Sequence, residues 1–206
     1  MNTIVPNRGP EAVAAALPLD DMRGIWAMWM VVATEAALFV CLFASYFYLE
    51  NNKDRWAYNK PPHEHWAFAG LAVVLVSAVV IWLGDRAVVA RRHLQARLML
   101  FITLLLGLLF LVFQGFDYAE HWATLTPYSN SYGSIFYAIE SFDAFHVVVG
   151  VLILAYVLVL PHYAPARRAP YRPYHCAAIY WYFVAIVWIA IVGLLYVMPN
   201  VRVYGF

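Results

Sequence analysis

Long apolar runs alternate with short polar segments along this chain, and five of the runs are long enough to cross a bilayer. A run near twenty residues, at about 1.5 Å of rise per residue, matches the ~30 Å hydrocarbon slab. A spanning segment must satisfy its own backbone hydrogen bonds, and runs of this length suit helices rather than barrel strands. We therefore predict an all-α, polytopic membrane protein, a bundle of five transmembrane helices at about 24–49, 66–84, 98–116, 134–160 and 177–198.

Composition agrees with the membrane class. The chain is 65% hydrophobic and 12% charged, against roughly 25% charged in soluble domains. The connections are too short to form a second domain, so residues 1–206 are expected to be a single transmembrane domain. The first ten residues lack an apolar core and are expected to be a short polar tail rather than a cleaved signal.

Basic residues predict the orientation in the membrane. Of the 13 lysines and arginines, nine fall in the N-terminal tail and in the loops 85–97 and 161–175, and four fall in the segments on the opposite side. This asymmetry favours an orientation with the N-terminus inside and the C-terminus outside. The net charge is +1 and no basic run is present, so no nucleic-acid partner is expected.

Four ionisable residues interrupt the apolar runs and form a candidate intramembrane polar site: Glu35, Glu140, Asp143 and His146. An isolated carboxylate in hydrocarbon costs about 2.5–3.5 kcal/mol on insertion scales, so Glu35 needs a partner or a neutral form. The other three residues are spaced i, i+3, i+6, which places neighbours on one helical face. We expect coupled protonation, a direct bond between Asp143 and His146, and a contact from His146 to Glu35.

Such a site can handle or gate protons, or it can be a polar clamp that fixes helix register. The clamp, or a contact with lipid or another subunit, is favoured because a proton path needs a polar chain across the membrane. The middle of the second predicted helix offers only Ser77 to such a chain, and the fifth offers no acid or base.

The sequence gives little sign of a redox centre or metal site. Only His146 lies well inside a predicted helix, whereas a bis-His haem needs two such histidines. His63 and His65 are expected to lie in a solvated loop rather than to form a surface metal site. Cys41 and Cys176 are expected to be small packing residues rather than a disulfide. We therefore expect no catalytic residue, metal or bound cofactor on this chain.

Four segments, in order, are similar to motifs of one family. Residues 34–39, Thr-Glu-Ala-Ala-Leu-Phe, resemble Ser-Glu-x-x-x-Phe, and residues 114–118, Gln-Gly-Phe-Asp-Tyr, resemble Gln-x-x-Glu-Tyr. Residues 142–150 resemble Phe-His-x-x-His-Val-x-x-Gly, and residues 177–188 resemble Ala-Ala-x-Tyr-Trp-His-Phe-Val-Asp-x-Val-Trp. The chain resembles subunit III of the haem-copper oxidase superfamily, in its five-helix form, over residues 24–198.

Specific positions match the family motifs and others depart from them. Glu35 aligns with the family's membrane carboxylate and His146 with its second histidine; further motif positions are Gln114, Asp117, Tyr180, Trp181 and Trp188. Asp143 stands where the family has its first histidine, and Glu140 stands near a usual threonine. Tyr182 replaces a histidine and Ala185 an aspartate. These changes predict that the polar network has moved from the fifth helix to the fourth.

The resemblance implies a non-catalytic subunit of an oxidoreductase and translocase complex, a cytochrome c or quinol oxidase, in the cell (inner) membrane. Subunits I and II are the implied partners, with a small subunit IV as a further candidate. Haem and copper are expected on partner subunits, and structural phospholipid is expected between the helices. The implied role is to support sustained dioxygen reduction and proton pumping in an aerobic respiratory chain.

Two other functions stay open. An accessory subunit of nitric oxide reductase is similar in sequence. A small proton-coupled transporter or channel would use Glu35 as its carrier carboxylate, but the sequence shows neither the internal repeat nor the interrupted helix found in many transporters.

Overall fold

The computed structural model describes residues 10–51, 63–123, 125–159 and 171–204, and every regular element in these ranges is a helix. The helices are α1 (Pro10–Asn51), α2 (His65–Val89), α3 (His93–Trp122), α4 (Ser131–Val159) and α5 (Tyr171–Ile191). The last continues through a π-helical segment, η2 (Val192–Val197), into α6 (Met198–Tyr204). Five helices are long and apolar enough to cross a membrane, which confirms the predicted fold class.

The helix ends differ from the prediction. Most strongly, α1 begins at Pro10 rather than at 24, α3 runs from His93 to Trp122 rather than over 98–116, and α5 begins at Tyr171 rather than at 177. Polar residues in these extensions, among them Asp117, are turned into the protein, so loss of hydrophobicity does not mark the helix end. Residues 1–9 of the predicted polar tail lie outside the described residues.

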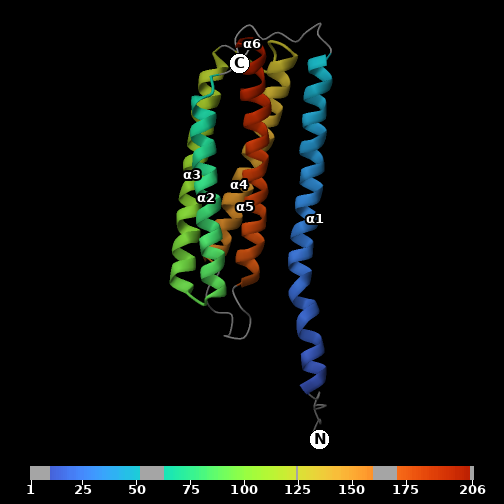
Figure 1. Ribbon diagram of the computed structural model, residues 1–206, viewed down its shortest axis with the longest axis vertical. Helices are drawn as coiled ribbons and strands as arrows, with labels where there is room; N and C mark the ends of the chain where they lie inside the picture. The colour runs from blue at the N-terminus through green and yellow to red at the C-terminus, as the bar shows by residue number, and fades with distance from the viewer. Residues whose placement is uncertain (1–9, 52–62, 124, 160–170, 205–206) are drawn as a thin grey trace, which may run out of the picture.

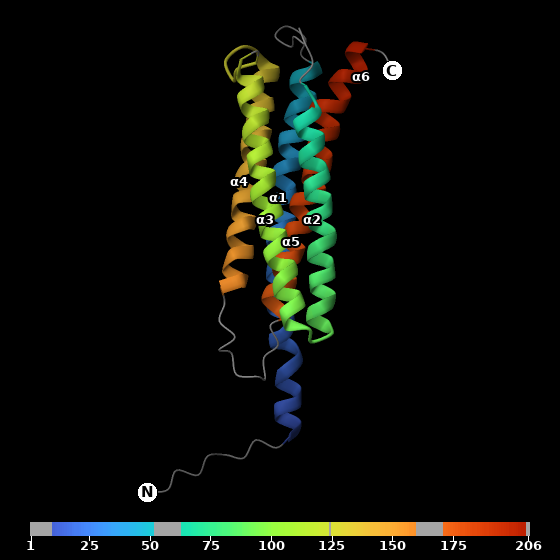
Figure 2. The same ribbon diagram turned by 90° about the vertical axis from the view of Figure 1, so that its left-hand side faces the viewer.

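The helices form three layers, with α4 and α5 in the middle (Figure 1). On one side, α2 and α3 pack closely against each other, α2 also contacts α5, and α3 contacts α4. On the other side, α1 packs on α4 and α5 and extends beyond the other helices at its N-terminal end (Figures 1 and 2). In the most apolar stretch of α1, 6% of the residues are buried, whereas in that of the span 173–201, 67% are buried. The last span is therefore the core of the bundle and α1 is its outer member.

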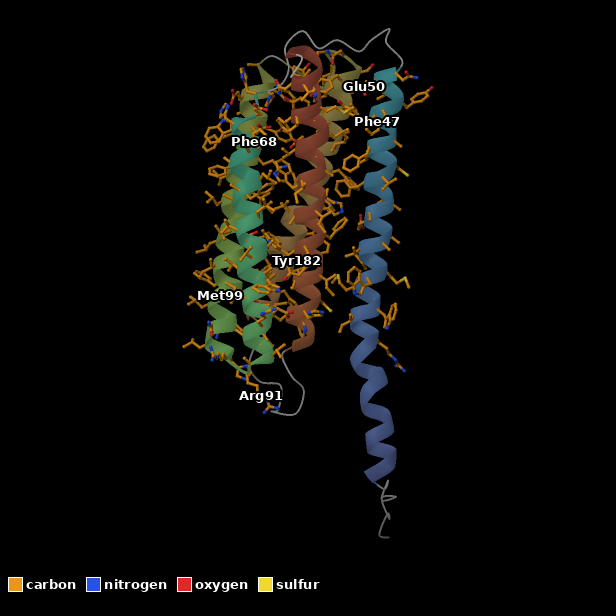
Figure 3. The ribbon with its side chains drawn as sticks, viewed as in Figure 1. Phe47, Glu50, Phe68, Arg91, Met99 and Tyr182 are labelled. Carbon is orange, nitrogen blue, oxygen red and sulfur yellow. The ribbon has the colours of Figure 1, made fainter. Side chains whose placement is uncertain are left out.

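The N-terminus, the α2–α3 turn and the start of α5 lie at one end of the bundle, and the C-terminus lies at the other (Figure 2). Arg91 marks the first end, while Phe47 and Glu50 lie towards the second (Figure 3). The tight turn is a Schellman-type cap, in which Arg92 N–H donates to Ala87 O over 2.8 Å and Arg91 takes a left-handed φ of 58°. This arrangement groups basic residues at one end, while the side of the membrane that this end faces stays a prediction.

Trp181 on α5 joins the middle layer to α2, α3 and α4. Its indole N–H donates to Ser77 Oγ over 2.8 Å, and Ser77 in turn donates to Val74 O over 2.7 Å. The indole ring lies against Gly107 of α3 and Gly150 of α4, where an added Cβ would come within 2.6 Å and 3.0 Å of ring carbons. The two glycines therefore create the space that this tryptophan fills.

The cysteines form no disulfide with each other: Cys41 and Cys176 are both free thiols. Cys41 is exposed on α1, so the expectation that it packs within this chain is wrong. The reason is that α1 turns much of its surface away from the bundle. Cys176 is partly buried, and its Sγ lies 3.7 Å from Gly24 O.

Substitution of Gly107 tests the space filled by Trp181. We expect Gly107→Ala to lower the free energy of unfolding by about 1–3 kcal/mol, as overpacking typically does, because the new methyl would meet the indole ring. The matched control is Gly115→Ala on the same helix, where nothing lies within 4 Å and alanine's helix propensity predicts a neutral or stabilising effect. Equilibrium unfolding of the purified chain in mixed micelles, followed by circular dichroism, measures both. Equal loss of stability in the two variants would contradict this packing.

Candidate functional site

The structure brings Glu35 of α1 against His146 of α4. His146 Nε2 and Glu35 Oε2 are 2.9 Å apart, and the other imidazole nitrogen, Nδ1, lies 2.7 Å from Phe142 O. The imidazole is 4% exposed and the Glu35 side chain 29% exposed. The contact expected from the sequence, with His146 as the partner of Glu35, is therefore confirmed.

Hydrogen counting fixes the charge of this pair. A carbonyl oxygen only accepts, so Nδ1 must carry a proton and donate it to Phe142 O. The short contact on the other side then needs one further proton between Nε2 and Glu35. That proton can sit on the carboxyl group or on the imidazole, and in either case the pair as a whole is neutral. A neutral pair avoids the large cost of an isolated charge in hydrocarbon.

Aromatic rings surround the imidazole. The ring of His146 lies 5.1 Å from Phe39, 4.7 Å from Phe142 and 6.2 Å from Phe183, measured between centroids. Tyr180 O–H donates to the backbone oxygen of His146 over 3.3 Å. The low polarity of this shell strengthens the hydrogen bond inside it, so the pair forms a polar link between α1 and the middle layer.

The four predicted polar residues do not form one site, and the expected bond between Asp143 and His146 is absent. Glu140, Asp143 and His146 all lie on buried parts of α4, but His146 uses its two nitrogens on Phe142 and Glu35. The physical reason is the helical pitch. At 3.6 residues per turn, two steps of three residues rotate the side chain by about 120° around the axis, so Glu140 and His146 face different neighbours.

Glu140 belongs to a second buried cluster, built from α3, α4 and η2. Tyr196 O–H lies 2.5 Å from Asp117 Oδ2 and 3.0 Å from Glu140 Oε1. Gln114 Nε2 lies 3.3 Å from Glu140 Oε2. His121 Nδ1 lies 2.8 Å from Asp117 O and 3.3 Å from Asp117 Oδ2. The side chains of all five residues are at most 5% exposed.

The π-helical segment presents Tyr196 to this cluster. A π-helix changes the hydrogen-bond spacing and is frequent at functional sites. Side chains satisfy carbonyl groups in and around it: Tyr132 O–H donates to Leu195 O over 3.0 Å, and Asn200 Nδ2 donates to Tyr196 O over 2.9 Å. These bonds hold η2 in the register that aims the tyrosine hydroxyl at α3 and α4.

The sequence interpretation missed Tyr196 and His121 as parts of a polar cluster. No local sequence pattern predicts that Tyr196 joins the cluster, because the direction of its side chain depends on the π-helix. His121 follows the end of the apolar run 98–116 and looks like a loop residue, but it lies buried in the last turn of α3. The available signal was spacing: Gln114, Asp117 and His121 are separated by three and four residues and share one face.

The motif positions on α5 are structural. Tyr180, Trp181 and Trp188 are 4%, 1% and 2% exposed, and the rings of Trp188 and Phe110 meet edge to face at 4.8 Å. Ala185 is also buried, so α5 presents no ionisable group there. The polar contact to Glu35 comes from α4 rather than α5, as expected from the departures from the family motifs.

Two further histidines lie against carboxyl groups of neighbouring helices. His175 Nδ1 lies 3.2 Å from Asp85 Oδ2, which links α5 to α2. His65 Nε2 lies 3.1 Å from Glu120 Oε2, which links α2 to α3. Within the described ranges, no group of three or more His, Cys, Asp or Glu residues is arranged to hold a metal ion.

Comparison with known proteins gives a consistent match. Residues 20–200 match the family model described as cytochrome c oxidase subunit III. The chain is similar to cytochrome c oxidase subunit 3 of Artemia franciscana, with 30% identity over 170 residues, and of Drosophila yakuba, with 27% identity over 172 residues; both matches cover 80% of this chain. That of Prototheca wickerhamii is 32% identical over 125 residues, 59% of this chain and 46% of the relative. The chain spans 65% of the length of the first two relatives.

Carbodiimide labelling tests the protonation of Glu35. A hydrophobic carbodiimide attacks protonated carboxyl groups that it can reach from the lipid. Glu35 is partly exposed, whereas Glu140 and Asp143 are 0% exposed. We expect label on Glu35 in the wild-type chain and none in Glu35→Gln, measured by mass spectrometry of the labelled peptides.

The matched control is His146→Ala, which removes the partner and leaves the carboxyl group in place. Because an unpaired carboxylate is costly in hydrocarbon, Glu35 should stay protonated and labelling should persist. Undiminished label in Glu35→Gln would show that another carboxyl group reacts, with Glu140 as the next candidate.

Proposed function

Because the chain belongs to the cytochrome c oxidase subunit III family, we propose that it is the non-catalytic subunit III of a haem-copper terminal oxidase in an aerobic respiratory chain. The observation that carries this proposal is the extent of the match, since residues 20–200 include nearly all of the five spans. The chain is a multi-pass membrane protein, and we place it in the cell (inner) membrane.

The partners would be subunits I and II, with a small subunit IV as a further candidate. Haem and copper would reside on these partners, as the resemblance to the family implies. The electron donor would be cytochrome c or quinol. The substrate of the complex would be dioxygen, reduced to water with proton pumping.

The surface of this chain supports a role in packing and lipid holding. Large apolar side chains are exposed on α1, including Trp26, Met30 and Val40 at 59%, 63% and 64%. Such exposure is stable only in lipid or against another apolar surface. Structural phospholipid held between helices, and contact with the catalytic subunit, would cover these surfaces.

The Glu35–His146 pair would serve this role as a clamp. It joins the outer helix α1 to α4, and it does so without a net charge. Polar contacts between membrane helices average only about 0.6 kcal/mol. The pair would therefore fix the relative position of α1 and α4 more than it would stabilise the fold. A transporter would need a polar chain through the bundle, whereas the surroundings of His146 are aromatic.

Native purification tests the identity of the complex. The full chain, carrying an affinity tag, is purified from its own membranes in mild detergent. We expect haem-containing subunits to co-purify and the preparation to consume dioxygen with reduced cytochrome c or quinol. Consumption of nitric oxide in place of dioxygen would point to an accessory subunit of nitric oxide reductase. A haem-free preparation that retains a folded chain would overturn the proposal.

Removal of this chain from the complex tests its role. Since no redox centre is proposed here, the initial rate of dioxygen uptake should be unchanged without it. The activity should then decay faster during continuous turnover, because lipid and packing at the catalytic subunit are lost. Oxygen-electrode traces of complexes with and without the chain measure this. Re-addition of purified chain and phospholipid is the control and should restore the longer lifetime.

A further inference from the structure

The cluster around Tyr196 contains more acceptors than donors if its acids are ionised. One hydroxyl group has one proton to donate, yet Tyr196 lies within hydrogen-bond distance of carboxyl oxygens from both Asp117 and Glu140. With both carboxyl groups ionised, one of the two contacts would bring oxygen lone pairs together. A proton on either acid removes this conflict, because that acid then donates to the tyrosine oxygen while the tyrosine donates to the other acid.

Asp143 gives a second, independent observation. It is 0% exposed, and neither of its carboxyl oxygens has a hydrogen-bond partner among the described residues. The side chain of Gln114 lies beside Asp143, but not in hydrogen-bond geometry with either of its carboxyl oxygens. The amide nitrogen of Gln114 points to Glu140, and its oxygen is also buried and without a donor. A protonated Asp143 would supply the donor that this oxygen lacks.

Charge balance leads to the same proton count. Asp117 and Asp143 both act electrostatically on Glu140, and the described base that faces these acids is His121. One base can balance at most one carboxylate in an interior that does not tolerate isolated charge. The other titratable neighbours are tyrosines, which are neutral at pH 7. Tyr118 and Tyr137 interact electrostatically with acids of the cluster, and Tyr180 interacts with Asp143 and Glu35.

We propose that Asp117, Glu140 and Asp143, with Tyr196 and Gln114, form a proton-binding site separate from the Glu35–His146 pair. The site holds two protons at neutral pH: one shared by Asp117 and Glu140 across the Tyr196 hydroxyl, and one on Asp143 directed at Gln114. It is built between α3, α4 and η2, towards the end of the bundle where the C-terminus lies (Figure 1).

Infrared spectroscopy of the full chain in lipid nanodiscs tests this proposal. Protonated carboxyl groups have a carbonyl stretch that ionised groups lack. All variants are made in a Glu35→Gln background, so that the Glu35–His146 pair contributes nothing to this carbonyl band. We expect this background to retain the protonated-carboxyl band at neutral pH and the band to shift in D₂O. Adding Asp143→Asn should remove part of the band, and adding Tyr196→Phe should shift the rest because the bridging hydroxyl is gone.

The matched control is Glu120→Gln on α3, which lies in a partly exposed ion pair with His65 and should leave the band unchanged. If Asp143→Asn fails to fold, Glu140→Gln takes its place. The Glu35→Gln variant alone also tests the proposal, through the presence or absence of its protonated-carboxyl band at neutral pH. Absence of the band there at neutral pH would overturn the proposal. So would a band that appears only after sodium or calcium is removed, because the acids would then be ionised and hold a cation. A band untouched by Asp143→Asn and Tyr196→Phe would also overturn it.

Discussion

Charge neutrality inside hydrocarbon governs where this bundle places its polar side chains. An isolated charge at the bilayer centre costs about 2.5–3.5 kcal/mol on insertion scales, which is a large fraction of a typical protein's stability. Glu35 meets this constraint through one imidazole, at 2.9 Å. The indole of Trp181 is uncharged, but its buried N–H needs an acceptor, and Ser77 Oγ supplies one at 2.8 Å. In both cases the polar contact crosses between helices, so the same bonds that satisfy buried polar groups also fix how the helices pack.

Part of this structure follows from the sequence. The number of spans follows from the length of the apolar runs, and the Glu35–His146 contact follows from depth, because the two residues lie at similar levels in antiparallel helices. The helix ends do not follow. Asp117 and His121 look like a polar boundary of α3, but they are buried against other helices and the helix continues past them.

The division of the polar residues into two sites was also beyond the sequence interpretation. Glu140, Asp143 and His146 resemble a single stripe when only neighbours three residues apart are compared. The rotation accumulates over two steps, so Glu140 faces α3 and η2 while His146 faces α1. The position of Tyr196 could not be predicted either, because it depends on the π-helical spacing of Val192–Val197. An apolar sequence does not distinguish this spacing from that of an α-helix.

The outer position of α1 has a consequence for the order in which the chain is assembled. His146 follows Glu35 by 111 residues, and Phe183, which packs on Phe39 at 6.0 Å, emerges later still. In the described structure α1 packs on α4 and α5, and both of these helices are synthesised after it. Until α4 is made, His146 is not there to share a proton with Glu35. Docking of α1 on α4 and α5 can therefore be completed only after both of these helices have been synthesised.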